Sequence, residues 1–230
     1  MRFRVSGWCL LFLAALGPAD TLPAADQKID PLREAPSGLS AEVVAAINSA
    51  GYRVTGKDGV ICDVWLAKEI PLKPNFKSSI RVKYPFQTGQ LIGVIRFPEG
   101  SKPTDFRGQA LKPGTYTLRY GLQPDDGNHL GTTEFGTRDF LVGCLPKADV
   151  DPKRVEDIKD LFKLSAQSAG STHPAIFLLL PPPEKPYDTA GVRHDEEKHL
   201  VILQTNANGK DGDKAVAVPV TVVAVGKTEG

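Results

Sequence analysis

The sequence has few cysteines, almost no methionine and few aromatic residues. It holds three Cys, one Met and two Trp in 230 residues, and aromatic side chains make up 7% of the chain. No Cys-x-x-Cys spacing occurs, which argues against a redox-active pair. A blue-copper site needs a Cys and a His close together with an axial group that is usually Met. It is excluded here because the only Met is the initiator and no Cys has a His within ten residues.

Common catalytic motifs are missing as well. The sequence has neither a GxSxG elbow nor the glycine loops GxGxxG and GxxxxGK[ST] that cradle phosphates. The segment RHDEEKHL places His194 and His199 five residues apart, which is not the HExxH spacing of zinc proteases. These absences favour a protein that is not an enzyme.

Long apolar runs are confined to the N-terminus. The first 19 residues, MRFRVSGWCLLFLAALGPA, place two arginines before a nine-residue apolar run and end on small residues. This layout is typical of a signal peptide, and a run of nine is too short to cross a bilayer. We expect residues 1–19 to be cleaved and the protein to be periplasmic or secreted, without a membrane span.

Charge of one sign is not in excess. Loss of Arg2 and Arg4 with the leader leaves 26 basic and 27 acidic residues. Such a balance does not direct a protein to nucleic acid. A partner would therefore be a protein, a component of the cell envelope or a small ligand.

What the chain does have is a two-residue hydrophobic period interrupted by turn residues, with 22 Gly and 19 Pro. This pattern predicts a mainly β protein, an antiparallel β-sandwich of immunoglobulin-like or jelly-roll type with one or two short helices. The predicted strands are 52–55, 60–66, 79–86, 91–98, 115–122, 138–145, 175–181, 199–204 and 217–225. Residues 181–198 read as an exposed loop.

Two helices are expected outside this pattern. Ser40 can cap a short helix that Gly51 closes, and Asp151 with Pro152 can begin a second helix near 152–165. Residues 20–38 have no period and read as a linker or disordered lead-in. Residues 39–230 would then form one β-sandwich domain.

Cys62 and Cys144 remain after loss of the leader, and both are expected to point into the core. If their strands lie in opposite sheets, they can form a disulfide, as exported proteins often do. The alternative is two buried thiols that never meet. The sequence leaves both open.

The turn QPDDGNHLG carries the residues from which a metal site could be built. It lacks the ligand order of a calcium loop, but His129 follows the turn directly and His173 stands at the start of a later strand. Asp126 and Asp139 are the carboxylates that could join them. A divalent metal is the only cofactor left open, and the alternative is that both histidines are structural or solvated.

Three further side chains bear on packing or binding. Trp65 can pack in the core or, if exposed, form part of a carbohydrate-binding surface. Arg119 and Arg138 lie on predicted strands, and Arg138 with Asp139 can pair with charges on a neighbouring strand.

The runs GVIRFPEG, DFRGQALKPGTYTLRYGLQPDDGNHLG, RDFLV and STHPAIFLL resemble a group of uncharacterised secreted bacterial β-sandwich proteins. The likeness spans roughly residues 52–226. It implies secretion and an all-β fold, and it brings no activity or site residue.

The sequence therefore favours a non-catalytic extracytoplasmic β-sandwich that binds a partner, an envelope component or a small ligand. A metal-binding protein or metal-dependent enzyme that uses His129 and His173 is the alternative. A carbohydrate-binding module is a third.

Overall fold

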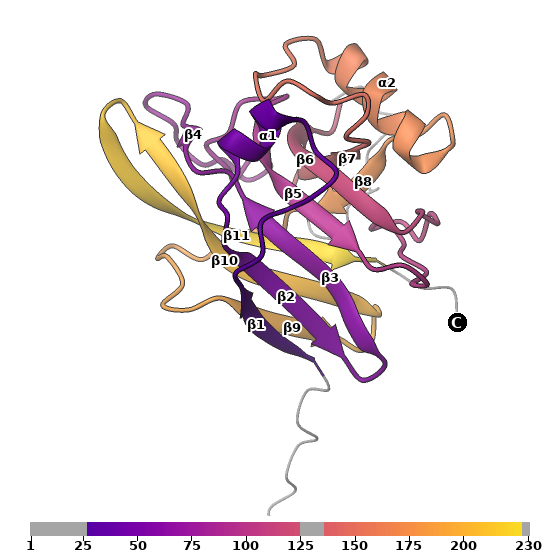
Figure 1. Ribbon diagram of the computed structural model, residues 1–230. Helices are drawn as coiled ribbons and strands as arrows, with labels where there is room; N and C mark the ends of the chain where they lie inside the picture. Colours follow the sequence, from indigo (N-terminus) through magenta and orange to yellow (C-terminus); the bar gives the residue numbers. More distant parts are fainter. Residues whose placement is uncertain (1–26, 125–135, 227–230) are drawn as a thin grey trace, which may run out of the picture.

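A computed structural model describes residues 27–124 and 136–226. These residues form two packed β-sheets with two helices outside them (Figure 1). The larger sheet has seven strands in the order β1-β2-β3-β5-β6-β7-β8, and the smaller has the order β11-β10-β4, with β9 also paired to β10. The elements are β1 (Lys28–Leu32), α1 (Ala41–Ala46), β2 (Gly51–Gly56), β3 (Gly59–Leu66), β4 (Ile70–Pro71), β5 (Leu91–Phe97), β6 (Gly114–Leu122), β7 (Asp139–Cys144), α2 (Ile158–Ala169), β8 (Ala175–Leu178), β9 (Gly191–Asp195), β10 (Leu200–Asp211) and β11 (Lys214–Val225).

The named strand pairs are antiparallel except for the two-residue contact between β4 and β10. The predicted mainly β, antiparallel sandwich is thus confirmed. The choice between an immunoglobulin-like and a jelly-roll type stays a prediction. No helix in the described ranges is long and apolar enough to cross a membrane.

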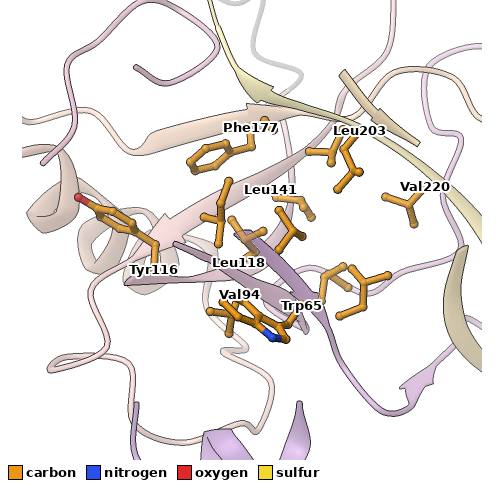
Figure 2. Close-up of a cluster of buried hydrophobic side chains, with 14 of the residues drawn as sticks. Trp65, Val94, Tyr116, Leu118, Leu141, Phe177, Leu203 and Val220 are labelled. Carbon is orange, nitrogen blue, oxygen red and sulfur yellow. The ribbon is translucent and has the colours of Figure 1, made fainter. Parts of the chain in front are cut away.

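The core between the sheets is built from the inward positions of both. Leu118, Leu141 and Phe177 come from the large sheet, and Leu203 and Val220 come from the small one (Figure 2). All five are at most 2% exposed. This face follows the two-residue period that the sequence predicts.

The large sheet is also covered on its outer face. In β7 all six residues are buried, and in β5 six of seven are. The cover consists of α1 with the chain before it, the segment that follows β7, and α2, which packs on β7 and β8 (Figure 1). Outward side chains that would be solvated on a two-layer sandwich therefore lie inside the protein.

The first predicted helix is confirmed, with its end at a different residue. Ser40 caps α1 by accepting a hydrogen bond from the N–H of Val43 at 3.2 Å. The helix ends at Ala46 with Ile47 as its C-cap, and Gly51 instead opens β2.

The second helix begins later than predicted. Its N-cap is Asp157, whose carboxylate accepts from the N–H of Lys159 at 2.6 Å. It ends at Ala169, with Gly170 as a C-cap in the left-handed conformation at φ 61°. Asp151 does not cap a helix because its carbonyl accepts a hydrogen bond from the buried Arg119. That contact holds the chain around Asp151 in a non-helical path.

One predicted strand is a loop. In the segment 79–86, the N–H groups of Lys83 and Tyr84 donate to the carboxylate of Asp139 at 2.8 and 3.2 Å. In a strand these donors would bond to a neighbouring strand. Three elements were missed. Lys28–Leu32 within the predicted lead-in forms β1 against β2, Gly191–Asp195 within the predicted loop forms β9 against β10, and the two-residue β4 pairs with β10.

The two cysteines are free and buried. The disulfide alternative is wrong for this structure because β3 and β7 belong to the same sheet. They lie three strand positions apart, or about 14 Å at ~4.8 Å per strand, whereas bonded cysteines need Cα atoms within about 7 Å. Cys62 faces the core between the sheets, and Cys144 faces α2.

Native protein is therefore expected to resist thiol reagents. Burial raises the pKa of both thiols, and the thiolate is the reactive form. Iodoacetamide should label neither cysteine in buffer, and both in guanidinium without any reductant. Mass spectrometry reads the number of adducts, and failure to label the unfolded chain unless it is first reduced would indicate a disulfide.

Candidate functional site

The two described residues of the predicted metal site, Asp139 and His173, do not come together. His129 and Asp126 lie outside the described residues. Asp139 begins β7, and its carbonyl accepts a hydrogen bond at 3.1 Å from the N–H of Leu179, the residue after β8. His173 lies six residues before Leu179, on the other side of β8. About 20 Å of extended chain at ~3.3 Å per residue thus separates Asp139 from His173. Over residues 27–124 and 136–226, no group of three or more His, Cys, Asp or Glu side chains could hold a metal.

Asp139 is a structural carboxylate. It is fully buried, and besides the two loop N–H groups its oxygens accept from the hydroxyls of Tyr120 and Thr137, each at 2.6 Å. Burial raises the pKa of Tyr120, and the negative charge of Asp139 raises it further. All four partners are donors, so the carboxylate fixes the loop 79–86 to β6 and β7 and has no path to solvent.

Arg119 is also internal. Its guanidinium is fully buried and makes two hydrogen bonds of 2.7 Å to Asp149, which follows β7. Thr117 donates to the same carboxylate. The Nε of Arg138 donates to the carbonyl of Gln123 at 2.7 Å.

Trp65 is fully buried, which removes the surface on which the carbohydrate interpretation depended. Its indole N–H donates to the carbonyl of Glu34 at 2.8 Å, and the guanidinium of Arg96 lies 5.1 Å from its ring centre. Arg96 and Arg53 both bond to Asp63. Burial acts to raise the pKa of Asp63, but the hydrogen bonds and charges of Arg53 and Arg96 outweigh it and lower that pKa.

A large cavity lies at one end of the sandwich, between the β2–β3 turn, residues 97–103 and β9. It measures about 910 Å³ and is lined by charges of both signs: Lys57, Asp58, Glu99 and Lys102. His194 of β9 lies beside it. Among the described lining residues, Phe97 is the one phenylalanine, tyrosine or tryptophan, and the charges are mixed, so the lining does not favour one class of ligand.

A second cavity of about 350 Å³ lies on the outer face of the large sheet beside α2, and we call it the α2 pocket. Its most deeply buried lining residues are Phe140 of β7 and Leu178 of β8, which are directly paired across the two strands. Phe162 of α2 packs on Phe140 with ring centres 6.1 Å apart, and Phe106 packs on the Leu178 cluster. Three aromatic rings from three different segments thus surround one apolar space.

The solvent side of the α2 pocket is polar. Arg107, Thr172 and His173 line it, and all three are exposed. The His173 N–H donates to the Ser171 hydroxyl at 3.1 Å, so the backbone before β8 is held while the imidazole remains at the mouth. Of the two described residues of the predicted metal site, His173 lines the α2 pocket and Asp139 does not.

Ser165 of α2 is close in sequence to His173 but does not line the pocket. Its hydroxyl donates to the carbonyl of Gly143 at 2.7 Å and accepts from the N–H of Ala175 at 3.0 Å. It connects α2 to β7 and β8. Sequence reasoning found His173 but missed Phe106, Phe140 and Phe162, because these rings lie far apart in the chain and read as ordinary core residues.

The fold and the pocket define a β-sandwich with a cavity of ligand size on its outer face. No protein-family model, no curated protein and no solved structure matches the chain.

Proposed function

We propose that this protein is a non-catalytic, extracytoplasmic β-sandwich that binds a small, largely apolar ligand in the α2 pocket. The observation that carries the proposal is the grouping of Phe106, Phe140 and Phe162 around a cavity of about 350 Å³. This volume falls at the lower end of small-molecule sites, which are mainly hydrophobic and aromatic with a few polar groups.

The fate of the charged side chains supports a binding role over catalysis. Asp139, Arg119 and Asp105 are each fully buried and engaged in internal hydrogen bonds. A catalytic acid or base must reach the substrate within hydrogen-bond distance, and these groups do not line the α2 pocket. The leader-like residues 1–19 support the extracytoplasmic part of the proposal.

N-phenyl-1-naphthylamine, an uncharged dye that fluoresces when it leaves water, tests the binding site. We expect saturable binding at one site with a Kd on the order of 10 μM, given the modest efficiency of ligands of this size. The variant Ile176→Trp, which replaces the isoleucine side chain in the pocket with a larger indole ring, should weaken binding of the dye at least tenfold. Ile176 is half-buried and lines the cavity, so the fold has room to accept the change.

Ile80→Trp is the matched control. Ile80 is 86% exposed and does not line the cavity, so this variant should bind the dye as the parent does. Equal weakening by both variants, or no saturable binding, would contradict the proposal.

Intact mass of the exported chain tests localisation: a start at Asp20 is expected, and full-length protein retained in the cytoplasm would contradict export.

A further inference from the structure

We infer that the α2 pocket selects anionic amphipathic ligands, with the apolar body among the three phenylalanines and a carboxylate or sulfonate at Arg107. This inference rests on the proposed function and adds the chemical class of the ligand. It is argued from the position of Arg107, its remaining hydrogen-bond donors and the charge of the pocket lining.

Arg107 is held at the mouth of the pocket by the chain that precedes β8. Its Nη2 donates to the carbonyl of Pro174 at 2.7 Å, and the N–H of the preceding Phe106 donates to the carbonyl of Ile176 at 2.7 Å. The loop around Arg107 therefore runs along β8. A guanidinium fixed in this way loses little conformational entropy when it receives an anion.

The neighbouring carboxylate of Asp105 does not use up the guanidinium. Asp105 already accepts three backbone N–H groups, from Arg107 and Gln109 at 2.9 Å and from Ile176 at 3.1 Å. Its contact with Arg107 Nη2 is single and longer, at 3.3 Å. By contrast, the buried Arg119–Asp149 pair makes two bonds of 2.7 Å.

Donors therefore remain for a ligand. The described structure gives Arg107 hydrogen bonds through its backbone N–H and through Nη2 only. The N–H groups of Nε and Nη1 remain, and the side chain is 40% exposed. Arginine donors in this planar arrangement match the oxygens of carboxylates and related anions.

The charge of the lining has one sign. Arg107 and His173 are its basic members, and no Asp or Glu is among the described residues that line the cavity. An anion at the mouth thus meets the guanidinium of Arg107, while the Asp105 carboxylate that contacts this guanidinium is fully buried and does not line the cavity. The adjoining apolar interior has a low dielectric constant, which strengthens such a contact.

Two dyes with the same ring system separate the apolar and anionic contributions. 1-Anilinonaphthalene-8-sulfonate is N-phenyl-1-naphthylamine with a sulfonate added, so the ratio of their affinities measures the gain from the anion. We expect the sulfonate to raise affinity about tenfold, in line with a charge-assisted hydrogen bond. Arg107→Gln should lower this ratio about tenfold, and Arg193→Gln, at an exposed position on β9 outside the pocket lining, should leave it unchanged.

The salt dependence of the parent protein gives a second readout that needs no variant. Raising NaCl from 50 to 500 mM should weaken binding of the sulfonate dye and leave the neutral dye unaffected. Equal affinities for the two dyes, with no effect of salt or of Arg107→Gln on their ratio, would overturn the inference while the proposed function stands. Absence of saturable binding by the neutral dye would instead overturn the proposed function.

Discussion

Replacing Arg119 with methionine is expected to lower the free energy of unfolding by about 3 to 5 kcal/mol, the usual cost of removing one partner of a buried ion pair. The substitution keeps much of the apolar stem but leaves the carboxylate of Asp149 buried without its counter-charge. Urea or thermal unfolding measures the loss. Arg193→Met, at an exposed position of β9, is the control and should change stability by less than about 0.5 kcal/mol.

The size of this effect follows from how completely Arg119 is used. Its five N–H groups make five hydrogen bonds: two to Asp149 and one each to the carbonyls of Gly89, Asp151 and Lys153. The residue therefore joins β6 to the chain on either side of Asp151, which leads into α2. In Arg119→Met, amide hydrogen exchange should increase most in residues 149–157.

The double variant Arg119→Met/Asp149→Leu separates the ion pair from the packing. Because both charges are removed, it should recover part of the stability lost in the single variant. A single variant as stable as the parent would mean that the pair contributes nothing. Losses that simply add in the double variant would mean that the two side chains are not coupled.

Replacing Asp139 with asparagine is expected to cost about 3 kcal/mol. The two carboxylate oxygens accept from four donors, namely the N–H groups of Lys83 and Tyr84 and the hydroxyls of Tyr120 and Thr137. In asparagine, one oxygen becomes an NH₂ group that meets donors, which leaves buried polar groups unsatisfied at about 1 to 3 kcal/mol for each lost partner.

Asp188→Asn is the matched control, since Asp188 is exposed, and it should change stability by less than about 0.5 kcal/mol. The local consequence expected for Asp139→Asn is faster hydrogen exchange in the loop 79–86, which the carboxylate anchors. Unchanged stability would show that the loop is held by Tyr84 and Phe86, whose buried rings stack with centres 5.6 Å apart, and not by Asp139.

Strand prediction succeeded where the side chains themselves carried the information. The segment TYTLRYGL alternates correctly as β6, with Tyr116, Leu118 and Tyr120 buried toward the small sheet. It failed at residues 79–86, where the same kind of alternation is present but the backbone donors are taken by Asp139. A distant carboxylate decided between strand and loop there, and nothing in the local pattern indicates it.

The α2 pocket could be predicted only in part. His173 drew attention as a histidine at the start of a strand, and it does lie at the mouth of the cavity. The three phenylalanines around the cavity come from the β5–β6 connection, β7 and α2, so only their packing brings them together. The four polar residues of the turn 125–129 lie outside the described structure.

By itself, the sequence determined the mainly β architecture, most of the strands and the helix capped by Ser40, because these depend on local periodicity and on which side chains satisfy nearby backbone groups. Only the tertiary structure decided that the outer face of the large sheet is covered. That cover turns Arg119 from a surface charge into a buried one, places Cys62 and Cys144 on opposite faces of one sheet, and leaves the α2 pocket between α2 and β8. The physical reason is that a two-residue period states which side chains share a face, and it does not state what packs against that face.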